Sequence, residues 1–346
     1  MSALTSVLIR RGTELISARL QYREQPQTHG LPGFLTVVFT VVAFGLAIFW
    51  VDYTCTHVIA TLAAVEDSHP TSYIRLEGED SNDTFNGNNT AKPITSGLRS
   101  AINYLRARGG IWSCFRGFRM YLAFTGLDFG AGLLISAIGP IQIAYPIRSL
   151  FGGFVTSMLL VTWQMAWIHL VIADKSPRRS FRRMLGLQHW PRIAPAAALY
   201  NFLTCVTLSA ATASWTAMSL VSSGFKGRLG LLATSIISAV FFLLLSIPAR
   251  AIFTRVAASM LPEEDEQIVP FDRHFNGKAK PEIVGGSGKL SIRDAWATFE
   301  WAARIRYVKI ILKAFAIEFA LAVVGILLVV GELALLNPSR ATPRQS

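Results

Sequence analysis

Charged residues are scarce in this sequence. They make up 16% of its 346 residues, whereas an ordinary soluble domain contains about 25%. The chain is also 52% apolar and has a mean hydropathy of +0.42. This combination excludes a chain that is disordered throughout, because disorder requires low hydrophobicity. It favours a protein with several membrane-spanning segments.

Cysteine is scarce too, and the common catalytic motifs are missing. The cysteines, Cys55, Cys114 and Cys205, form no Cys-x-x-Cys pair, and none stands at a metal-ligand spacing from a histidine. Three thiols cannot form a closed disulfide framework. The sequence has no Gly-rich phosphate loop, no His-Glu-x-x-His, no Gly-x-Ser-x-Gly and no paired Asp-rich motif. We therefore expect no metal site, no cofactor and no enzymatic activity, with the cysteines packed as small apolar residues.

Long apolar runs are abundant. A membrane-spanning helix needs about 20 mostly apolar residues, and six runs meet this condition. We place them at Phe34–Ala63, Met120–Tyr145, Leu150–Ile172, Ile193–Val221, Leu229–Ile247 and Val308–Leu336. The predicted fold class is therefore all-α, an integral membrane bundle of about six helices. Because the loops after the second and fourth spans are very short, we expect the helices to form three hairpins.

Basic residues are concentrated in the three long loops, 57–119, 174–192 and 248–313. Most of the 33 Lys and Arg residues lie there, and the formal net charge is +12. Basic loops stay on the cytoplasmic or matrix side of a membrane. We therefore expect these loops on that side and both chain ends on the other. Since the positive charge is explained by topology, nucleic acid is not an expected partner.

The chain divides into an N-terminal surface segment 1–32, a membrane domain 33–336 and a tail 337–346. Two interpretations of the first segment remain open, a short amphipathic surface helix and a mitochondrial transit peptide. The acidic, Asn-rich loop 66–93 lacks hydrophobic periodicity and is expected to be disordered. Its sequons at Asn82 and Asn88 would reverse the topology if they were glycosylated. The compartment therefore stays open between the mitochondrial inner membrane and the endomembrane or plasma membrane.

Two basic amphipathic helices are expected in the long loops, near 94–108 and 291–303. Ser291 and Asp294 have the spacing of a capping box at the start of the second one. Helices of this kind lie in the membrane interface and bind anionic headgroups. The expected partners are therefore membrane lipids, anionic lipids among them. The lipid- or anion-contact candidates are Arg99, Arg106, Arg182 and Arg183.

A few ionisable residues fall inside the predicted spans. They are Asp52, Asp128, His169 and Glu318. Such residues are costly in lipid and mark functional sites by default, so these four are our transport-site candidates. Asp128 and Glu318 lie deepest, and His169, which titrates near neutral pH, can pair with either. Gln164 and Asn201 are interpreted as interhelical hydrogen-bonding groups.

The repeated unit of a hairpin and a loop helix is similar to the architecture of mitochondrial carriers. The run from Arg108 to Gly117 resembles that family's loop motif ending in Arg-Gly. The run from Pro248 to Arg255 resembles a fragment of its helix signature, Pro-x-acid-x-x-base. Arg250 stands where the family has an acid, so the usual salt-bridge gate is not expected. The resemblance implies a carrier of small solutes.

A second resemblance covers about half of the chain. It rests on Leu98–Arg108 followed by Trp112–Gly117, and on Trp167–Ile172 leading through Arg182-Arg183 to Ile193–Ala196. These segments look like a family of multispanning proteins of filamentous fungi, whose members are often labelled ubiquitin carrier or ubiquitin-conjugating protein. Conjugating enzymes are soluble α/β domains with a His-Pro-Asn turn before a nucleophilic cysteine. The nearest segment here is His69-Pro70-Thr71, so we do not expect conjugating activity.

Together these features predict a carrier- or transporter-like membrane protein for a small solute. The alternative is a membrane scaffold that binds anionic lipid or partner proteins through its basic loops, without catalysis. The two hypotheses differ in what the intramembrane carboxylates do. Neutral variants of Asp128 and Glu318 would impair a carrier and leave a scaffold intact. The sequence specifies neither the solute nor the oligomeric state.

Overall fold

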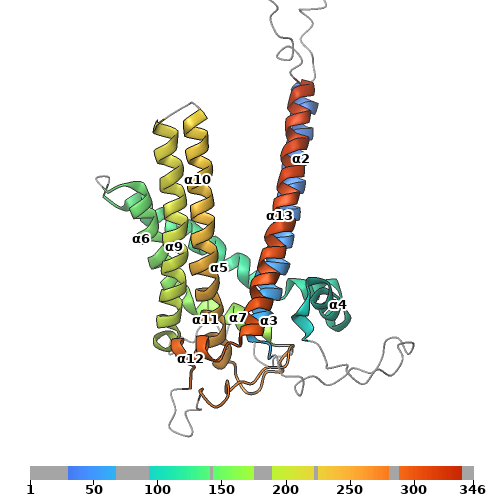
Figure 1. The fold of residues 1–346 in the computed structure, drawn as a ribbon, viewed down its shortest axis with the longest axis vertical. Coiled ribbons are helices and arrows are strands. Elements are labelled where there is room, and N and C mark those ends of the chain that lie inside the picture. The colour runs from blue at the N-terminus through green and yellow to red at the C-terminus, as the bar shows by residue number, and fades with distance from the viewer. Residues whose placement is uncertain are drawn as a thin grey trace, which may run out of the picture. The chain divides into compact units, whose positions relative to one another are not determined.

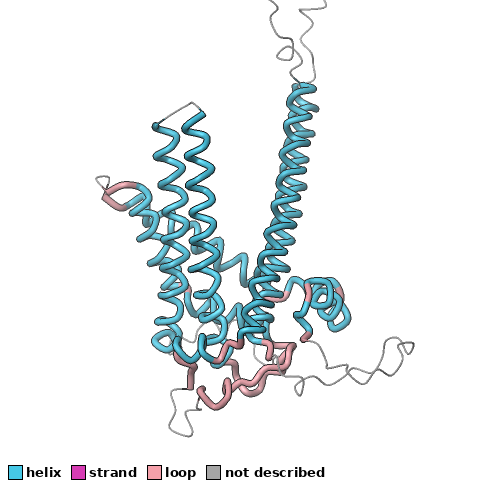
Figure 2. The backbone as a smooth tube through the Cα atoms, viewed as in Figure 1, coloured by secondary structure: helices cyan, strands magenta, loops and turns pink. Residues whose placement is uncertain are grey.

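The computed structural model describes residues 30–67, 93–140, 143–174, 189–221, 225–279 and 288–336. Within these ranges the chain is helical, as Figures 1 and 2 show. No strand is present in them, apart from an isolated bridge between Ala173 and Gln267. The predicted all-α fold class is confirmed.

Several predictions fall outside the described residues and are not tested by the structure. They concern segment 1–29, most of the acidic loop with Asn82 and Asn88, the pair Arg182 and Arg183, and the tail 337–346. The proposed surface helix, transit peptide and glycosylation therefore stay predictions.

Within the described residues, five helices are long and apolar enough to cross a membrane. They are Gly33–Val65, Ile111–Ile138, Trp190–Ser214, Ala233–Ser259 and Trp301–Leu335. A sixth candidate is the helix pair α6 (Tyr145–Leu159) and α7 (Val161–Ile172), which is bent by 60°. The predicted count of about six spans agrees with five helices plus this broken one. The length and composition of its helices make this an integral membrane protein.

The chain separates into two compact units. The terminal unit combines Met1–Trp50 with Ala316–Ser346, and the central unit is Val51–Phe315. Described elements of the central unit before α6 are η1 (Asp52–Ile59), α3 (Ala60–Val65), η3 (Ile94–Ser96), α4 (Leu98–Gly109), η4 (Ile111–Phe115) and α5 (Phe118–Ile138). After α7 come α9 (Trp190–Val221), α10 (Phe225–Phe241), η6 (Phe242–Ser246), α11 (Ile247–Ser259), α12 (Ile292–Ala297) and the first part of α13 (Trp301–Leu336).

The terminal unit pairs the first and last spans. Helix α2 (Gly30–Val51) lies beside the C-terminal part of α13 (Figure 1). The hydroxyl of Thr40 donates a 2.7 Å hydrogen bond to Oε1 of Glu332. A Cβ atom at Gly325 would lie 3.0 Å from Cγ of Phe44, so the small residue permits this close approach. Helices from opposite ends of the sequence therefore form a pair that the expected hairpins did not include.

The central unit contains two further pairs, α5 with α6 and α9 with α10. Small residues bring the first pair together. A Cβ atom at Gly132 would lie 3.6 Å from Cα of Gly153. The hydroxyl of Ser136, also on α5, donates a 2.6 Å hydrogen bond to the carbonyl of Gly132, so this hydrogen bond stays within α5. Close backbone packing of this kind holds helices together in lipid, where apolar burial supplies little drive.

The predictions for the second and third spans are wrong in part. The second span ends at Ile138 and not at Tyr145, which instead begins α6. Pro146 occupies the first turn of α6, where its missing N–H would have no partner anyway. The third predicted span, Leu150–Ile172, is not one straight helix, because the chain bends at Leu160 between α6 and α7.

The fifth and sixth spans are longer than predicted. The fifth does not stop at Pro248 but continues through α11 to Ser259. The π-helical segment η6 ends at Ser246, two residues before the proline, and widens the helix, so the proline is accommodated without ending it. The sixth begins at Trp301, seven residues before Val308.

The first predicted loop helix is present as α4, but its apolar face packs on protein. Ala101 and Leu105 are fully buried. The hydroxyl of Tyr104 donates to the carbonyl of Ile268 at 2.9 Å, and burial raises its pKa. Arg99 and Arg106 lie on the exposed side of the helix, as expected for lipid-contact candidates.

The second loop helix is shorter than the predicted 291–303. It is α12, which ends at Ala297, and α13 begins soon afterwards. Oγ of Ser291 accepts a hydrogen bond from the backbone N–H of Asp294 at 3.1 Å, so the predicted N-cap is confirmed. The Asp294 carboxylate accepts from the Ser291 hydroxyl at 2.6 Å.

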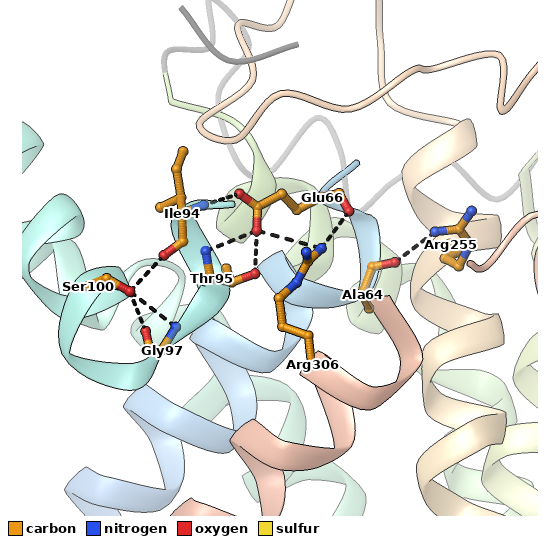
Figure 3. Close-up of polar contacts among 8 residues, drawn as sticks. All are labelled: Ala64, Glu66, Ile94, Thr95, Gly97, Ser100, Arg255 and Arg306. Carbon is orange, nitrogen blue, oxygen red and sulfur yellow. Dashed lines mark hydrogen bonds and ion pairs between the residues drawn. The ribbon is translucent and has the colours of Figure 1, made fainter. Parts of the chain in front are cut away.

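Glu66 differs most from its prediction, because it belongs to the loop expected to be disordered. It is 1% exposed. As Figure 3 shows, Oε1 accepts from the backbone N–H of Ile94 at 2.6 Å, while Oε2 accepts from the N–H and the hydroxyl of Thr95. Arg306 donates to the Glu66 carbonyl at 3.0 Å and lies 3.9 Å from the carboxylate. Glu66 therefore joins the chain on both sides of segment 68–92.

Glu66→Gln is expected to destabilise the protein, because an amide keeps the size of the side chain but turns one acceptor into a donor. A donor would then face the N–H of either Ile94 or Thr95, at a cost of about 1–3 kcal/mol for the group left without an acceptor. The measurement is the thermal unfolding midpoint in detergent, with exposed Glu263→Gln as the control. Equal midpoints for the two variants would contradict the assignment.

Candidate functional site

A cavity of about 380 Å³ lies inside the central unit. Its walls come from η1, α5, α6, α7, α9 and α11. Cavities from about 300 to 1,000 Å³ are typical of small-molecule sites. The side chains that give it chemistry are His57, Tyr121, Asp128, Gln164, Asn201, Thr204 and Arg250.

One end of the cavity holds a hydrogen-bonded chain of side chains. Nη2 of Arg250 lies 3.0 Å from Nδ1 of His57. A guanidinium only donates, so Nδ1 accepts and the hydrogen of the neutral ring lies on Nε2. That nitrogen is 3.0 Å from the Tyr121 hydroxyl and 3.5 Å from Oδ2 of Asp52. The contacts fix the position of the Arg250 guanidinium at the cavity wall.

Irregular helix geometry places both His57 and Arg250. His57 lies inside the π-helical segment η1, and Arg250 follows the π-helical segment η6 after four residues. A π-helical turn inserts a residue and rotates the helix face that follows it, and such turns recur at functional sites. The two irregular turns therefore bring onto one cavity side chains that a regular helix would have directed elsewhere.

Aromatic rings surround this end. The ring centroids of His57 and Tyr121 are 4.6 Å apart, and those of Tyr121 and Trp167 are 5.9 Å apart. Nε1 of Trp167 donates to the Tyr53 hydroxyl at 3.4 Å. Rings in contact with several neighbours have few alternative rotamers, so the polar groups are held in place before a ligand binds.

The other end of the cavity carries a carboxylate. Oδ1 of Asp128 accepts a 2.8 Å hydrogen bond from the Ser157 hydroxyl, which joins α5 to α6. Asp128 follows Tyr121 on α5 by seven residues, about 10 Å along the helix axis. Among the residues that line the cavity, Asp128 and Arg250 are the one carboxylate and the one guanidinium.

Uncharged polar groups also line the cavity. Nδ2 of Asn201 is 3.5 Å from Oε1 of Gln164, a long contact that joins α9 to α7. This agrees with the interhelical role predicted for both residues, although both also line the cavity. Oγ1 of Thr204 is buried and has no hydrogen-bond partner among the described residues. A polar ligand would satisfy such a group.

The transport-site candidates named from the sequence do not form one cluster. Asp128 lines the cavity, and Asp52 is linked to it through His57. His169 does not line it, since its buried Nε2 donates to the carbonyl of Ala257 at 2.8 Å. Glu318 belongs to the terminal unit.

Sequence reasoning missed His57, Tyr121 and Arg250 as site residues. Arg250 was read only as a departure from a carrier motif, because the fifth span was ended at Pro248. The apolar residues after it, such as Phe253 and Val256, were the signal that the helix continues. His57 falls within both the predicted first span, 34–63, and the predicted loop 57–119, and was not counted among the ionisable residues of the spans.

The cysteines and acidic groups form no metal centre in the part of the chain that the structure describes. No three His, Cys, Asp or Glu side chains come close enough there to hold an ion. Cys55 and Cys114 are buried, while Cys205 is half-buried and lines the cavity.

The apolar helices and the polar cavity between them define a multispanning helical membrane protein with a small-molecule-sized site. No family model matches the chain, and no curated protein is similar enough to count as a relative. The two resemblances noted in the sequence therefore stay predictions.

Proposed function

We propose that this protein is a carrier that binds a small polar solute in the cavity and moves it across the membrane. The observation that supports it most is the cavity itself, because its walls carry both a guanidinium and a carboxylate within helices of membrane-spanning length. Ionisable groups at membrane depth are costly and line solute pathways in transporters. The proposal involves no covalent chemistry.

The broken third span also supports a carrier. Helices α6 and α7 meet at a 60° bend at Leu160, and both line the cavity. Discontinuous helices commonly form the substrate sites of secondary transporters, because their irregular backbone is tolerated where it borders a cavity. A bend at the site also provides a hinge between two rigid parts of one span.

One observation favours the scaffold alternative. Ile111 and Trp112 are 66% and 83% exposed, and they follow the exposed arginines Arg99 and Arg106 of α4. Exposed aromatic residues beside basic ones anchor a protein in the headgroup region of a membrane. A carrier can have the same anchor, so the two functions are separated by solute transport.

Blocking the cavity tests the carrier proposal. In Thr204→Trp an indole ring fills much of the cavity, and solute uptake is expected to be lost because no room remains for a ligand. Uptake is measured in proteoliposomes with radiolabelled amino acids, ω-amino acids, dicarboxylates, polyamines and sugars. The matched control is Ala210→Trp, at an exposed position on the same helix that does not line the cavity.

Uptake of at least one solute by the wild type and by Ala210→Trp, with loss in Thr204→Trp, supports a carrier. Absence of uptake of every solute by a correctly folded wild-type protein rejects it. Vesicle binding that depends on phosphatidylserine and on Arg99 and Arg106 would then favour the scaffold.

A further inference from the structure

The cavity carries two opposite charges on different helices. Arg250 comes from α11 and Asp128 from α5, and no other Lys, Arg, Asp or Glu among the described residues lines it. The two side chains do not contact each other, since Arg250 contacts His57, whose Nε2 lies 3.5 Å from Asp52, and Asp128 contacts Ser157. Both are half-buried, and a charge withdrawn from water is stabilised by a partner of opposite sign. Each end of the cavity is therefore suited to one charged group of a ligand.

Both groups have bonding capacity left. The guanidinium has five N–H donors in a planar fork that matches a carboxylate, and its contact with His57 involves Nη2 alone. Ser157 contacts Oδ1 of Asp128, and Oδ2 has no hydrogen-bond partner among the described residues. A ligand carboxylate fits the first site and a ligand ammonium the second.

The spacing of the two charges indicates the length of the ligand. Arg250 is held near Tyr121 by His57, whereas Asp128 lies about 10 Å further along α5. An Asp side chain is too short to close this gap. An α-amino acid carries both charges on one carbon atom, so it cannot contact both residues as well as a longer molecule can.

The rest of the cavity wall suits an extended carbon chain. Phe124, Trp167 and Phe253 supply apolar surface to it, and Gln164 and Asn201 supply amides. Aromatic faces also attract the CH groups next to an ammonium. The cavity thus fits several methylene groups with few polar substituents.

We propose that the cavity selects an elongated zwitterion, of the ω-amino acid class, with its carboxylate on Arg250 and its ammonium on Asp128. This inference rests on the proposed carrier function and adds the class of solute. A molecule with one charge leaves the other protein charge without a partner, and that loss is the source of the selectivity.

Binding to the purified full-length protein tests the inference, with the thermal unfolding midpoint as the readout over a concentration series. The probes are 4-aminobutyrate, 6-aminohexanoate, glycine, butyrate and n-butylamine at pH 7. The two ω-amino acids are expected to bind at least about tenfold more tightly than the other three, because each of these lacks one charge or the necessary length. Equal binding of a single-charge probe or of glycine overturns the inference.

Two variants assign each charge to its partner. In Arg250→Gln, 4-aminobutyrate and n-butylamine are expected to bind equally, since the carboxylate no longer has a cation to contact. In Asp128→Asn, 4-aminobutyrate and butyrate are expected to bind equally, since the ammonium no longer has an anion to contact. A preference for the zwitterion that persists in both variants overturns the assignment. If either variant misfolds, the five probes still test the inference on the wild-type protein.

A phospholipid headgroup can present the same pair of charges. The binding experiment therefore includes phosphatidylethanolamine, added to the detergent-purified protein, and soluble phosphoethanolamine as the matched headgroup. Stabilisation by the lipid and by no soluble zwitterion overturns the assignment to a free solute. If the protein takes up a solute with one charge and Thr204→Trp blocks this uptake, the result supports the carrier proposal and overturns the inference that the solute is a zwitterion.

Discussion

Replacement of Arg255 by methionine is expected to lower the thermal unfolding midpoint by about 10 °C. Arg255 is 4% exposed, and methionine keeps most of its volume while removing the guanidinium. The loss corresponds to about 3–5 kcal/mol, because several buried carbonyl groups lose their donor at once. Unfolding is followed in detergent by the fluorescence of the tryptophans.

The reason for so large an effect is that Arg255 joins three helices. From α11 it donates to the carbonyl of Ala64 in the last turn of α3 at 2.9 Å (Figure 3). It also donates to the carbonyl of Ala295 in α12 at 3.0 Å, and to the carbonyl and hydroxyl of Thr298. A cation at helix C-termini is stabilising, since the last carbonyls have no intrahelical partner.

Ring contacts add to these hydrogen bonds. Cζ of Arg255 lies 4.6 Å from the ring centroid of Phe275 and 5.0 Å from that of Phe299. A planar guanidinium can stack on rings and donate in its own plane together, which an ammonium cannot. Arg255→Lys is therefore expected to recover only part of the stability.

Arg99→Gln is the control for these variants, because Arg99 is exposed on α4. Its midpoint should stay within about 2 °C of the wild type, as surface substitutions change stability little. If Arg255→Met had the same thermal unfolding midpoint as Arg99→Gln, the contribution of Arg255 to stability would be refuted. Full recovery by Arg255→Lys would show that charge alone matters there.

Gly152→Ala is expected to separate α5 from α6. A Cβ atom at position 152 would lie 2.6 Å from Oγ of Ser136 and 2.8 Å from the carbonyl oxygen of Gly132. The second contact is with backbone, so relief requires a shift of one helix against the other. Overpacking of this kind costs about 1–3 kcal/mol, and the thermal unfolding midpoint is expected to fall accordingly.

The same substitution should also weaken solute binding. Both helices line the cavity, and the contact between Ser157 and Asp128 crosses from one to the other. Movement of α6 away from α5 would lengthen that contact and leave the Asp128 carboxylate less well positioned. The measurement is the affinity for 6-aminohexanoate, which is expected to fall together with the midpoint.

Gly130→Ala is the matched control for Gly152→Ala. A Cβ atom at Gly130 meets nothing within 4 Å. Alanine is about 1 kcal/mol more favourable than glycine inside a helix, so this variant should melt at the wild-type temperature or above it. A Gly152→Ala protein as stable as Gly130→Ala would contradict the packing described for α5 and α6.

The prediction of the helices from sequence succeeded where the length of an apolar run alone decides whether a segment spans the membrane. An apolar run of about 20 residues needs no tertiary partner to be recognised, since backbone groups in lipid must be satisfied within a helix. The boundaries failed at Pro248 and at Leu160. At both places the course of the helix depends on a local π turn or bend, which hydropathy does not register.

The candidate site was predicted only in part, for a different reason. Membrane depth selected Asp128, which lines the cavity, but it also selected His169, whose ring donates to the Ala257 carbonyl. Depth along the membrane says nothing about which direction a side chain points. Arg250 and His57 became neighbours across 193 positions of sequence only when α11 packed near η1.

By itself, then, the sequence determined that this is a helical membrane protein with about six spans and few, mostly basic charges. These properties follow from composition and run length, because lipid imposes the same requirement on every segment. Only the tertiary structure decided that the first and last spans form a pair. It alone brought Arg250 and Asp128 onto one cavity and buried Glu66 against Thr95. Those contacts depend on helix rotation and irregular turns, which no linear pattern of residues specifies.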